Sequence, residues 1–231
     1  MRHLLAMGGG GFLMEPDNLA LDRHLLSLSG KTRPKVCFVG TASGDAADCE
    51  ERFYRSMAEL DCAPRHLSLF HPPEGDLRAF VLDQDVFYVG GGNTRNLLVL
   101  WKEWGLDRML AEAWARGAVL GGISAGAICW FEQGLTDSVT GTLQPLTGLG
   151  FLRGSACPHY DGEAARRPAY REAVGSGAML PGIACDDGVA AHFVDGELVS
   201  FVSSRPGARA YRVERVDGVV TEEPVEPVLL R

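Results

Sequence analysis

Through the first two thirds of the chain, short apolar runs alternate with segments whose apolar residues recur every three or four positions. The short runs predict buried strands at residues 4–7, 36–39, 67–69 and 86–89. The periodic segments predict amphipathic helices at residues 19–28, 45–60, 97–104 and 106–116. Repeated strand–helix units predict an α/β fold with a doubly wound, mostly parallel sheet and helices on both of its faces. We expect function at the carboxyl ends of the strands.

Residues 119–132 combine both patterns and place Ser124 at their junction. Residues 119–123 are typical of the end of a buried strand, and the Ala-rich residues 125–131 predict a helix packed on a sheet. The segment 122–126 fits G-x-S-x-G, in which glycines permit a tight turn that exposes a nucleophile. A glycine-lined turn without a catalytic role also fits so short a motif. The strand before it and the helix after it favour catalysis.

Backbone amides near this turn could stabilise negative charge on a bound carbonyl oxygen. A helix that starts after Ser124 leaves its first amides unpaired, that of Ala125 first. The glycines of Gly90-Gly-Gly-Asn-Thr94, which follow a predicted strand, could present a second N–H to the same oxygen. A phosphate-binding turn or a merely tight turn is the alternative interpretation of this glycine motif.

The last third of the chain does not continue the alternation of predicted strands and helices. Residues 136–154 are rich in Gly, Thr and Pro and predict loops, residues 168–174 predict a short helix, and residues 183–185 and 189–194 predict strands. Asp-Gly pairs at 195–196 and 217–218 predict hairpin turns. The C-terminal part is therefore expected to be a β-rich extension with mixed or antiparallel pairing.

Two polar motifs in this region carry candidate catalytic groups. His159 lies in Cys157-Pro-His-Tyr-Asp161, and a serine nucleophile needs an imidazole base. Asp186 and Asp187 follow a predicted strand, and either could orient that imidazole, although adjacent aspartates before a glycine are more often a plain turn. The other five histidines have no such company, and His192 in a predicted strand is expected to be structural.

Composition narrows the class of protein. The chain has 231 residues, 46% of them hydrophobic, which is enough for one sizeable core, and we expect a single domain spanning 1–231. A formal charge of −8 argues against binding nucleic acid or an anionic membrane through bulk electrostatics. Six scattered cysteines without C-x-x-C spacing predict reduced, buried thiols and no metal site. No signal peptide, long apolar run, P-loop or complete G-x-G-x-x-G is evident, so we expect a cytoplasmic protein without organic cofactor.

Four of these motifs together resemble the peptidase E family of serine peptidases. They are Gly-Gly-Gly-Asn-Thr at 90–94, Gly-Ile-Ser-Ala-Gly at 122–126, Pro-His-Tyr-Asp at 158–161 and Asp-Asp-Gly at 186–188. That family includes aspartyl dipeptidases and cyanophycinases and shares a flavodoxin-like fold with class I glutamine amidotransferases. The resemblance covers roughly residues 4–213, and four ordered motifs are far more specific than any one of them.

The resemblance implies a role for each matching residue. It makes Ser124 the nucleophile and His159 the general base, and it assigns the oxyanion amides to Gly92 and Ala125. We also expect Asn93, in the same motif as Gly92, to line the substrate site.

The third member of the triad is where this chain departs from the family. The family usually has a glutamate at the position of Asp187, and an aspartate is one methylene shorter, so the strand end must approach His159 more closely. Glutamine amidotransferases place the acid two residues after the histidine, which is Asp161 here. We favour Asp187, but residues two apart in a strand share a face, so Asp161 stays an alternative.

The expected function is that of a serine peptidase which hydrolyses short peptides, dipeptidase-like and with a preference for an acidic residue. Arg166 and Arg167 match only loosely an arginine that binds the substrate carboxylate in the family, and a solvated helix start is the alternative. A monomer or homodimer acting on a small peptide, without metal or cofactor, is expected. The competing hypotheses are a serine-dependent amidase or glutaminase-like hydrolase and a peptide-binding module without turnover.

Overall fold

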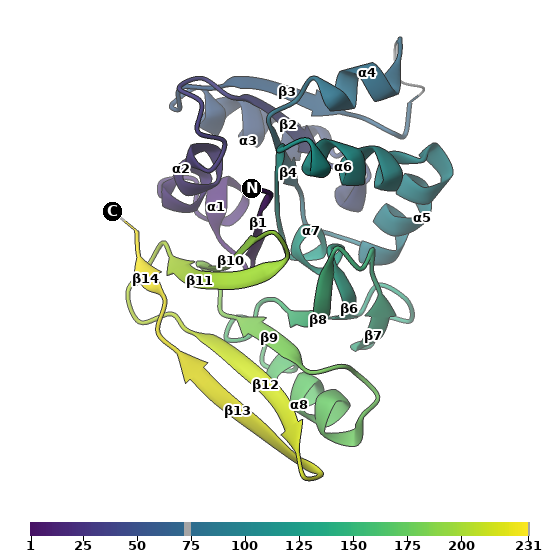
Figure 1. Cartoon of the computed structure of the whole chain (residues 1–231), viewed down its shortest axis with the longest axis vertical. Helices are drawn as coiled ribbons and strands as arrows, with labels where there is room; N and C mark the ends of the chain where they lie inside the picture. Colours follow the sequence, from purple (N-terminus) through teal and green to yellow (C-terminus); the bar gives the residue numbers. More distant parts are fainter. Residues whose placement is uncertain (72–74, 231) are drawn as a thin grey trace.

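The computed structural model describes residues 1–71 and 75–230, which form two β-sheets and their covering helices (Figure 1). Parallel strands make up the centre of the larger, eight-stranded sheet. In spatial order they are β1 (His3–Met7), β5 (Val119–Ile123), β4 (Val86–Val89), β2 (Lys35–Val39) and β3 (Ala63–Leu67). Because these five strands are parallel, the carboxyl ends of β1, β4 and β5 share one edge of the sheet. Beyond β1 the strand direction reverses.

Three later strands complete this sheet on the side of β1. β10 (Val189–Val194) pairs antiparallel with β1, and β11 (Glu197–Ser203) pairs antiparallel with β10. β14 (Val228–Leu229) lies parallel to β11 at the edge. The C-terminal part of the chain therefore returns to the strand that opened it.

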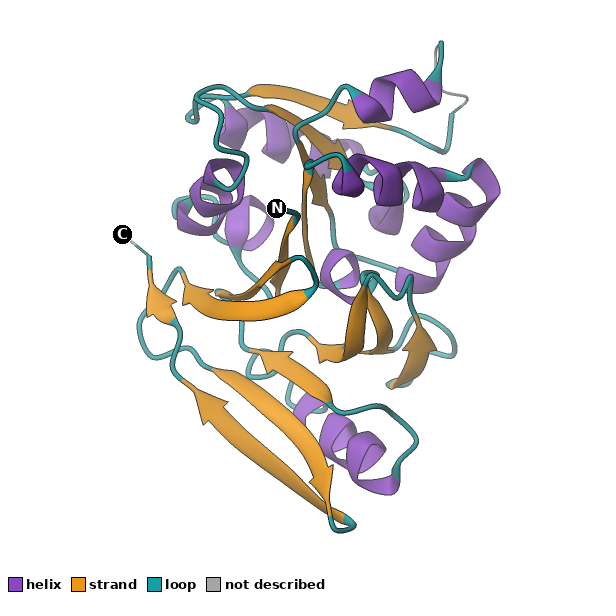
Figure 2. Cartoon of the chain, in the orientation of Figure 1, coloured by secondary structure: helices purple, strands orange, loops and turns teal. Residues whose placement is uncertain are grey.

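Helices cover both faces of the larger sheet (Figure 2). One face carries α1 (Gly11–Met14), α2 (Ala20–Ser27) and α3 (Ala47–Met57). The other carries α4 (Leu77–Leu82), α5 (Thr94–Trp104), α6 (Leu106–Ala115) and α7 (Ala125–Ile128). Alternate residues of β1 belong to opposite cores, because successive side chains of a strand point to opposite faces. This confirms the predicted doubly wound α/β fold.

The second sheet has six strands and contains the β-rich extension. Its order is β13 (Val219–Val225), β12 (Ala210–Val216), β9 (Gly182–Cys185), β8 (Leu152–Cys157), β6 (Phe131–Thr136) and β7 (Gln144–Thr147). β6, β8 and β9 run parallel, whereas β7, β12 and β13 pair antiparallel. α8 (Arg166–Ser176) packs on β12 and β13. The predicted mixed pairing is confirmed.

Both predicted Asp-Gly hairpin turns are present. Asp195 and Gly196 join β10 to β11 with φ of 52° and 90°, and Asp217 and Gly218 join β12 to β13 with φ of 51° and 82°. Two successive positive φ values define the turn whose twist matches that of antiparallel strands.

The strand predicted at 67–69 is wrong in its position. β3 spans Ala63–Leu67, an edge strand whose exposed Arg65 and His66 hide the strand from the apolar pattern. Residues 69 and 70 leave the sheet because their N–H groups donate to the Asp45 carboxylate (2.8 and 3.1 Å). Asp45 itself has φ 53° and lies outside α3, so the helix begins later than the predicted residue 45.

The helix predicted at 125–131 is also wrong in its extent. α7 ends at Ile128, and β6 begins at Phe131. The carbonyl oxygens of Cys129 and Trp130 accept hydrogen bonds from Leu149 and Leu152 (2.8 and 2.9 Å), so this stretch pairs with another chain segment. A continuous apolar run does not distinguish a buried helix from a buried strand. The loop predicted at 136–154 likewise contains β7 and parts of β6 and β8.

Across the described parts of the chain, no helix combines the length and apolar character that a membrane crossing needs.

Three histidines without a candidate catalytic partner in the sequence, His3, His24 and His192, lie close together in the structure. His3 is the first residue of β1. His3 Nδ1 and His192 Nε2 are hydrogen-bonded at 3.0 Å, and the rings of His24 and His192 meet edge to face with centroids 5.7 Å apart. Burial, and then the charges of His24 and His3, lower the pKa of His192 to about 4. No group of three or more metal-ligating side chains in residues 1–71 and 75–230 is placed to hold a metal ion. His192 therefore packs among other histidines, and its structural role stays a prediction.

His192 should make its own contribution to the pH dependence of folding stability. An unfolded histidine has a pKa near 6.5, so between about pH 6.5 and 4 the unfolded chain binds a proton that folded His192 does not. Stability should therefore fall as the pH drops through this window, by up to about 3 kcal/mol from this group. Denaturant unfolding at several pH values should show that the free energy of unfolding of the parent falls relative to that of His192→Gln as the pH drops through this window. Burial raises the pKa of Asp22 to about 6, which gives the opposite slope. That slope is common to both proteins, and equal slopes in the two would contradict the prediction.

Candidate active site

Ser124 occupies a strained turn between β5 and α7. Its backbone has φ 57° and ψ −113°, a conformation that a residue with a side chain rarely adopts. A Cβ at Gly122 would lie 2.4 Å from the Gly126 carbonyl oxygen, and a Cβ at Gly126 would lie 2.3 Å from that of Val89. The two glycines of the G-x-S-x-G segment are therefore required by close backbone approach, and the turn presents the serine side chain at the sheet edge.

Two backbone amides beside Ser124 are available to an incoming oxygen. Ala125 opens α7, so its N–H has no acceptor within that helix. The N–H of Gly92 has no backbone acceptor among residues 1–71 and 75–230. The Gly90–Gly92 turn passes close to the serine, because a Cβ built on Gly91 would lie 3.2 Å from Ser124 Cβ. Gly92 has φ 132°, which favours glycine.

The end of β1 holds Ser124 and His159 at neighbouring positions. The Ser124 N–H donates to the Met7 carbonyl oxygen and the His159 N–H to that of Gly8, both at 3.1 Å. His159 has φ 52°, so its backbone is strained as well. Two consecutive carbonyls thus bring together residues that lie 35 positions apart in the sequence.

His159 is oriented by Asp187. His159 Nδ1 donates to Asp187 Oδ1 at 2.5 Å, and the two side chains are 12% and 16% exposed. With Nδ1 engaged, Nε2 is the ring nitrogen left to accept a proton. No direct hydrogen bond joins Ser124 Oγ to His159 among the described residues, and such bonds are often long in sites without substrate.

Glycines make room for the Asp187 carboxylate. A Cβ at Gly9 would lie 1.9 Å from Asp187 Oδ1, and a Cβ at Gly162 would lie 2.3 Å from Oδ2. The Gly9 carbonyl oxygen also accepts a hydrogen bond from Gly188 N–H (3.1 Å). Gly9 of the glycine run 8–11 therefore packs against Asp187, a role that the sequence alone did not reveal.

Gly9→Ala should disturb this pairing without disturbing the core. The added methyl group displaces the Asp187 carboxylate from His159, and a shift of about 1 Å can lower turnover about 100-fold. Steady-state kinetics would measure the loss, and thermal unfolding would check that the fold persists. Parental turnover in a folded Gly9→Ala protein would show that the Asp187 position does not matter.

Asp161, the alternative acid, contacts the main chain of Asp187. Its Oδ1 accepts a hydrogen bond from the Asp187 N–H (2.8 Å), and its Oδ2 pairs with Arg205 Nη2 (3.3 Å). The imidazole of His159 bonds to Asp187, so the geometry favours Asp187 as the orienting acid.

The arginines expected to bind substrate have structural partners. Arg166 is 5% exposed, and it donates through Nη1 to the Leu135 carbonyl oxygen (3.0 Å) and through Nε to Glu163 (2.7 Å). This burial contradicts the solvated helix start, whereas the role of Arg166 in binding a substrate carboxylate stays a prediction. Arg167 is half exposed and forms an ion pair with Glu222. Its guanidinium lies over the rings of two tyrosines, Tyr160 and Tyr211.

Asn93 begins a helix. Its side-chain oxygen accepts a hydrogen bond from Asn96 N–H (2.8 Å) at the start of α5, and its Nδ2 donates to the Ser138 carbonyl oxygen (3.3 Å). These are the contacts of a helix cap, and they occupy the groups that the predicted substrate-lining role would use.

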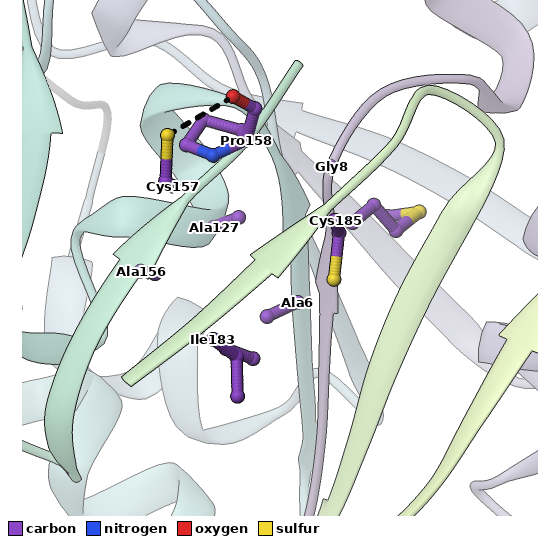
Figure 3. Close-up of a pocket in the computed structure, with 9 residues that line it drawn as sticks. Ala6, Gly8, Ala127, Ala156, Cys157, Pro158, Ile183 and Cys185 are labelled. Carbon is purple, nitrogen blue, oxygen red and sulfur yellow. Dashed lines mark hydrogen bonds between the residues drawn. The ribbon is translucent and has the colours of Figure 1, made fainter. Parts of the chain in front are cut away.

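An apolar cavity with a volume of about 10 Å³ lies beside Pro158 and Gly8 (Figure 3). The small side chains of Ala6, Ala127 and Ala156 and the thiols of Cys157 and Cys185 line it. Burial raises the pKa of Cys157 to about 12 and also raises that of Cys185. These thiols are therefore uncharged and poor nucleophiles at neutral pH, and the cavity has room for no more than about one water molecule.

Comparison with known proteins gives concordant matches. A family model described as "Peptidase family S51" matches residues 4–201. The "Uncharacterized peptidase YgaJ" of Bacillus subtilis (strain 168) is 57% identical over 225 residues, which are 97% of each chain.

Two solved structures share the fold at 17% identity. A peptidase from an acI-B1 Actinobacterium has a TM-score of 0.72 and is matched over 98% of this chain and 95% of its own. A protein of Listeria monocytogenes EGD-e assigned to peptidase E has a TM-score of 0.59, with 98% and 100% covered.

Proposed function

Since the chain belongs to peptidase family S51 and is a serine-type peptidase, we propose that it hydrolyses short peptides, dipeptides among them, through Ser124, His159 and Asp187. One observation carries this proposal. Consecutive carbonyls at the end of β1 bind the backbones of Ser124 and His159, and His159 is in turn bonded to Asp187 at 2.5 Å. A nucleophile, a base and an orienting acid that converge in this way support acyl transfer.

The proposed reaction begins with attack of Ser124 Oγ on the scissile carbonyl carbon. The hydroxyl proton passes to His159 Nε2, and the Asp187 carboxylate stabilises the imidazolium that forms. The amides of Gly92 and Ala125 donate to the oxyanion of the tetrahedral intermediate. The C–N bond then breaks as the imidazolium returns its proton to the leaving amine. Water hydrolyses the acyl group on Ser124 by the same route.

The proposed substrates are short peptides in general and are not restricted to peptides with an acidic residue. Arg166 and Arg167 are both engaged with carboxylates of the chain itself, so neither supports selection of an acidic residue. We therefore propose short peptides as the class and leave the preferred side chain to the experiment that follows.

A dipeptide panel that varies both residues, with free glutamine beside it and amine release as the readout, tests the proposal. We expect turnover of a subset of dipeptides and none of glutamine. Release of ammonia from glutamine without dipeptide turnover would support the amidase hypothesis instead. Binding of dipeptides without turnover of either would support a peptide-binding module.

A further inference from the structure

The main chain of Asp187 is held from both sides by two charged side chains. Asp161 Oδ1 accepts a hydrogen bond from the Asp187 N–H (2.8 Å), and Arg205 Nε donates to the Asp187 carbonyl oxygen (2.7 Å). The same two side chains meet each other, with Arg205 Nη2 3.3 Å from Asp161 Oδ2. These contacts close a ring around one residue, which we call the Asp187 clamp.

We propose that Asp161 and Arg205 are positioning residues, which act together to align the Asp187 carboxylate with His159. The inference rests on the proposed function, in which Asp187 orients the catalytic base. It adds two residues that bond to the main chain of Asp187 and not to the imidazole, and that act through Asp187.

The clamp joins chain segments that are distant in the sequence. Asp161 follows β8, Asp187 lies in the short connection between β9 and β10, and Arg205 follows β11. The backbone of Arg205 is fixed by Ser203, whose buried hydroxyl accepts from the Arg205 N–H and donates to its carbonyl oxygen (3.2 and 2.7 Å). The guanidinium therefore projects from an anchored loop, and the clamp is tied to the larger sheet.

The alignment of Asp187 depends on its main chain because its carboxylate has few other partners. Among the described residues, His159 is the one hydrogen-bond donor to the Asp187 side chain, and the faces of the carboxylate are bounded by Gly9 and Gly162. Neither glycine donates a hydrogen bond to the carboxylate. A small rotation of the Asp187 peptide would therefore change the bond to His159.

The exposure of the Asp161–Arg205 ion pair supports the same inference. Arg205 and Asp161 are 39% and 45% exposed, and a half-exposed ion pair adds little to folding stability. An error of about 1 Å in a catalytic group can nevertheless lower turnover about 100-fold. The clamp should therefore matter much more for catalysis than for the fold, which separates a positioning role from a merely structural one.

The test compares the full-length parent with Asp161→Ala, Arg205→Met and the double variant. Two conservative variants, Asp161→Asn and Arg205→Lys, retain an acceptor for the Asp187 N–H and a positive charge, respectively, and should restore part of the function. Arg209→Met is the matched control, because it removes a similarly exposed cation whose side chain faces Glu226 (4.0 Å). Thermal unfolding confirms that each variant is folded.

The first measurement does not depend on any substrate. NMR of ¹⁵N-histidine-labelled protein follows the exchange of the His159 Nδ1–H with water. We expect this exchange to be about tenfold faster or more in Asp161→Ala and Arg205→Met, because the bond to Asp187 opens more often. Exchange should be unchanged in Arg209→Met. Parental exchange in both clamp variants would overturn the inference, whatever the enzyme hydrolyses.

The second measurement uses the best dipeptide of the panel. Each clamp variant should lower kcat about 10- to 100-fold with little change in KM. The double variant should lose no more than the worse single variant, because either change opens the same ring. Multiplicative losses, or a change in KM alone, would overturn the inference. Full activity of Ser124→Ala would instead sink the proposed function and leave the proton-exchange result standing on its own.

Discussion

Replacement of Ser124 by alanine is expected to lower dipeptide turnover by on the order of 10⁶, the loss seen when the nucleophile of a triad is removed. The hydroxyl supplies the atom that attacks the carbonyl carbon, and no other group of the site can replace it. Alanine keeps the Cβ of serine, so the strained turn at φ 57° is no more costly than before. The fold should therefore persist.

Initial rates of amine release from the best dipeptide would measure this loss. Ser27→Ala provides the matched control, because it removes an exposed hydroxyl on α2, whose contact is with the His24 carbonyl oxygen. Turnover within tenfold of the parent would remove Ser124 from the mechanism.

Asp187→Asn is expected to lower turnover by roughly 10⁴ while the shape of the site is kept. An asparagine cannot stabilise the imidazolium of His159, and its amide group favours the wrong tautomer of the ring. Asp161→Asn should cost much less, because the Asp161 side chain bonds to the Asp187 N–H and not to the imidazole.

Parallel kinetics of the two asparagine variants decide between the acids. Both substitutions remove one negative charge and add no volume, so each serves as the control for the other. A larger loss for Asp161→Asn would reverse the assignment in favour of the arrangement found in glutamine amidotransferases.

The layered architecture could be predicted from the sequence because strand and helix periods are local. The apolar run at β4 and the glycine between α5 and α6 each mark their element without reference to the rest of the fold. The sequence mispredicted the bounds of elements that depend on contacts with distant parts of the chain. Asp45 draws residues 69 and 70 away from the sheet, and pairing with a distant segment converts the end of the apolar run after α7 into β6.

The same difference between local and long-range information applies to the candidate site. The turn at Ser124 could be predicted because its motif encodes it, whereas the choice between Asp161 and Asp187 depends on how separate strand ends meet. The packing of Gly9 against Asp187 and the contacts of Arg205 have no local signal at all. The burial of Arg166 has no local signal either, because it depends on the Leu135 carbonyl oxygen, 31 positions earlier.

Ser124 is expected to form a covalent acyl-enzyme, which mass spectrometry of the acid-quenched enzyme would detect. A peptidyl ester that acylates faster than the acyl group is hydrolysed would be mixed with the protein and quenched within the first turnover. Ser124 Oγ displaces the alcohol of the ester and keeps the acyl group. We predict that the peptide containing residues 119–132 gains the mass of that group on Ser124, and that Ser124→Ala shows no gain. An acyl group on another residue, or continued turnover with no adduct under conditions that should trap it, would show that Ser124 is not the nucleophile.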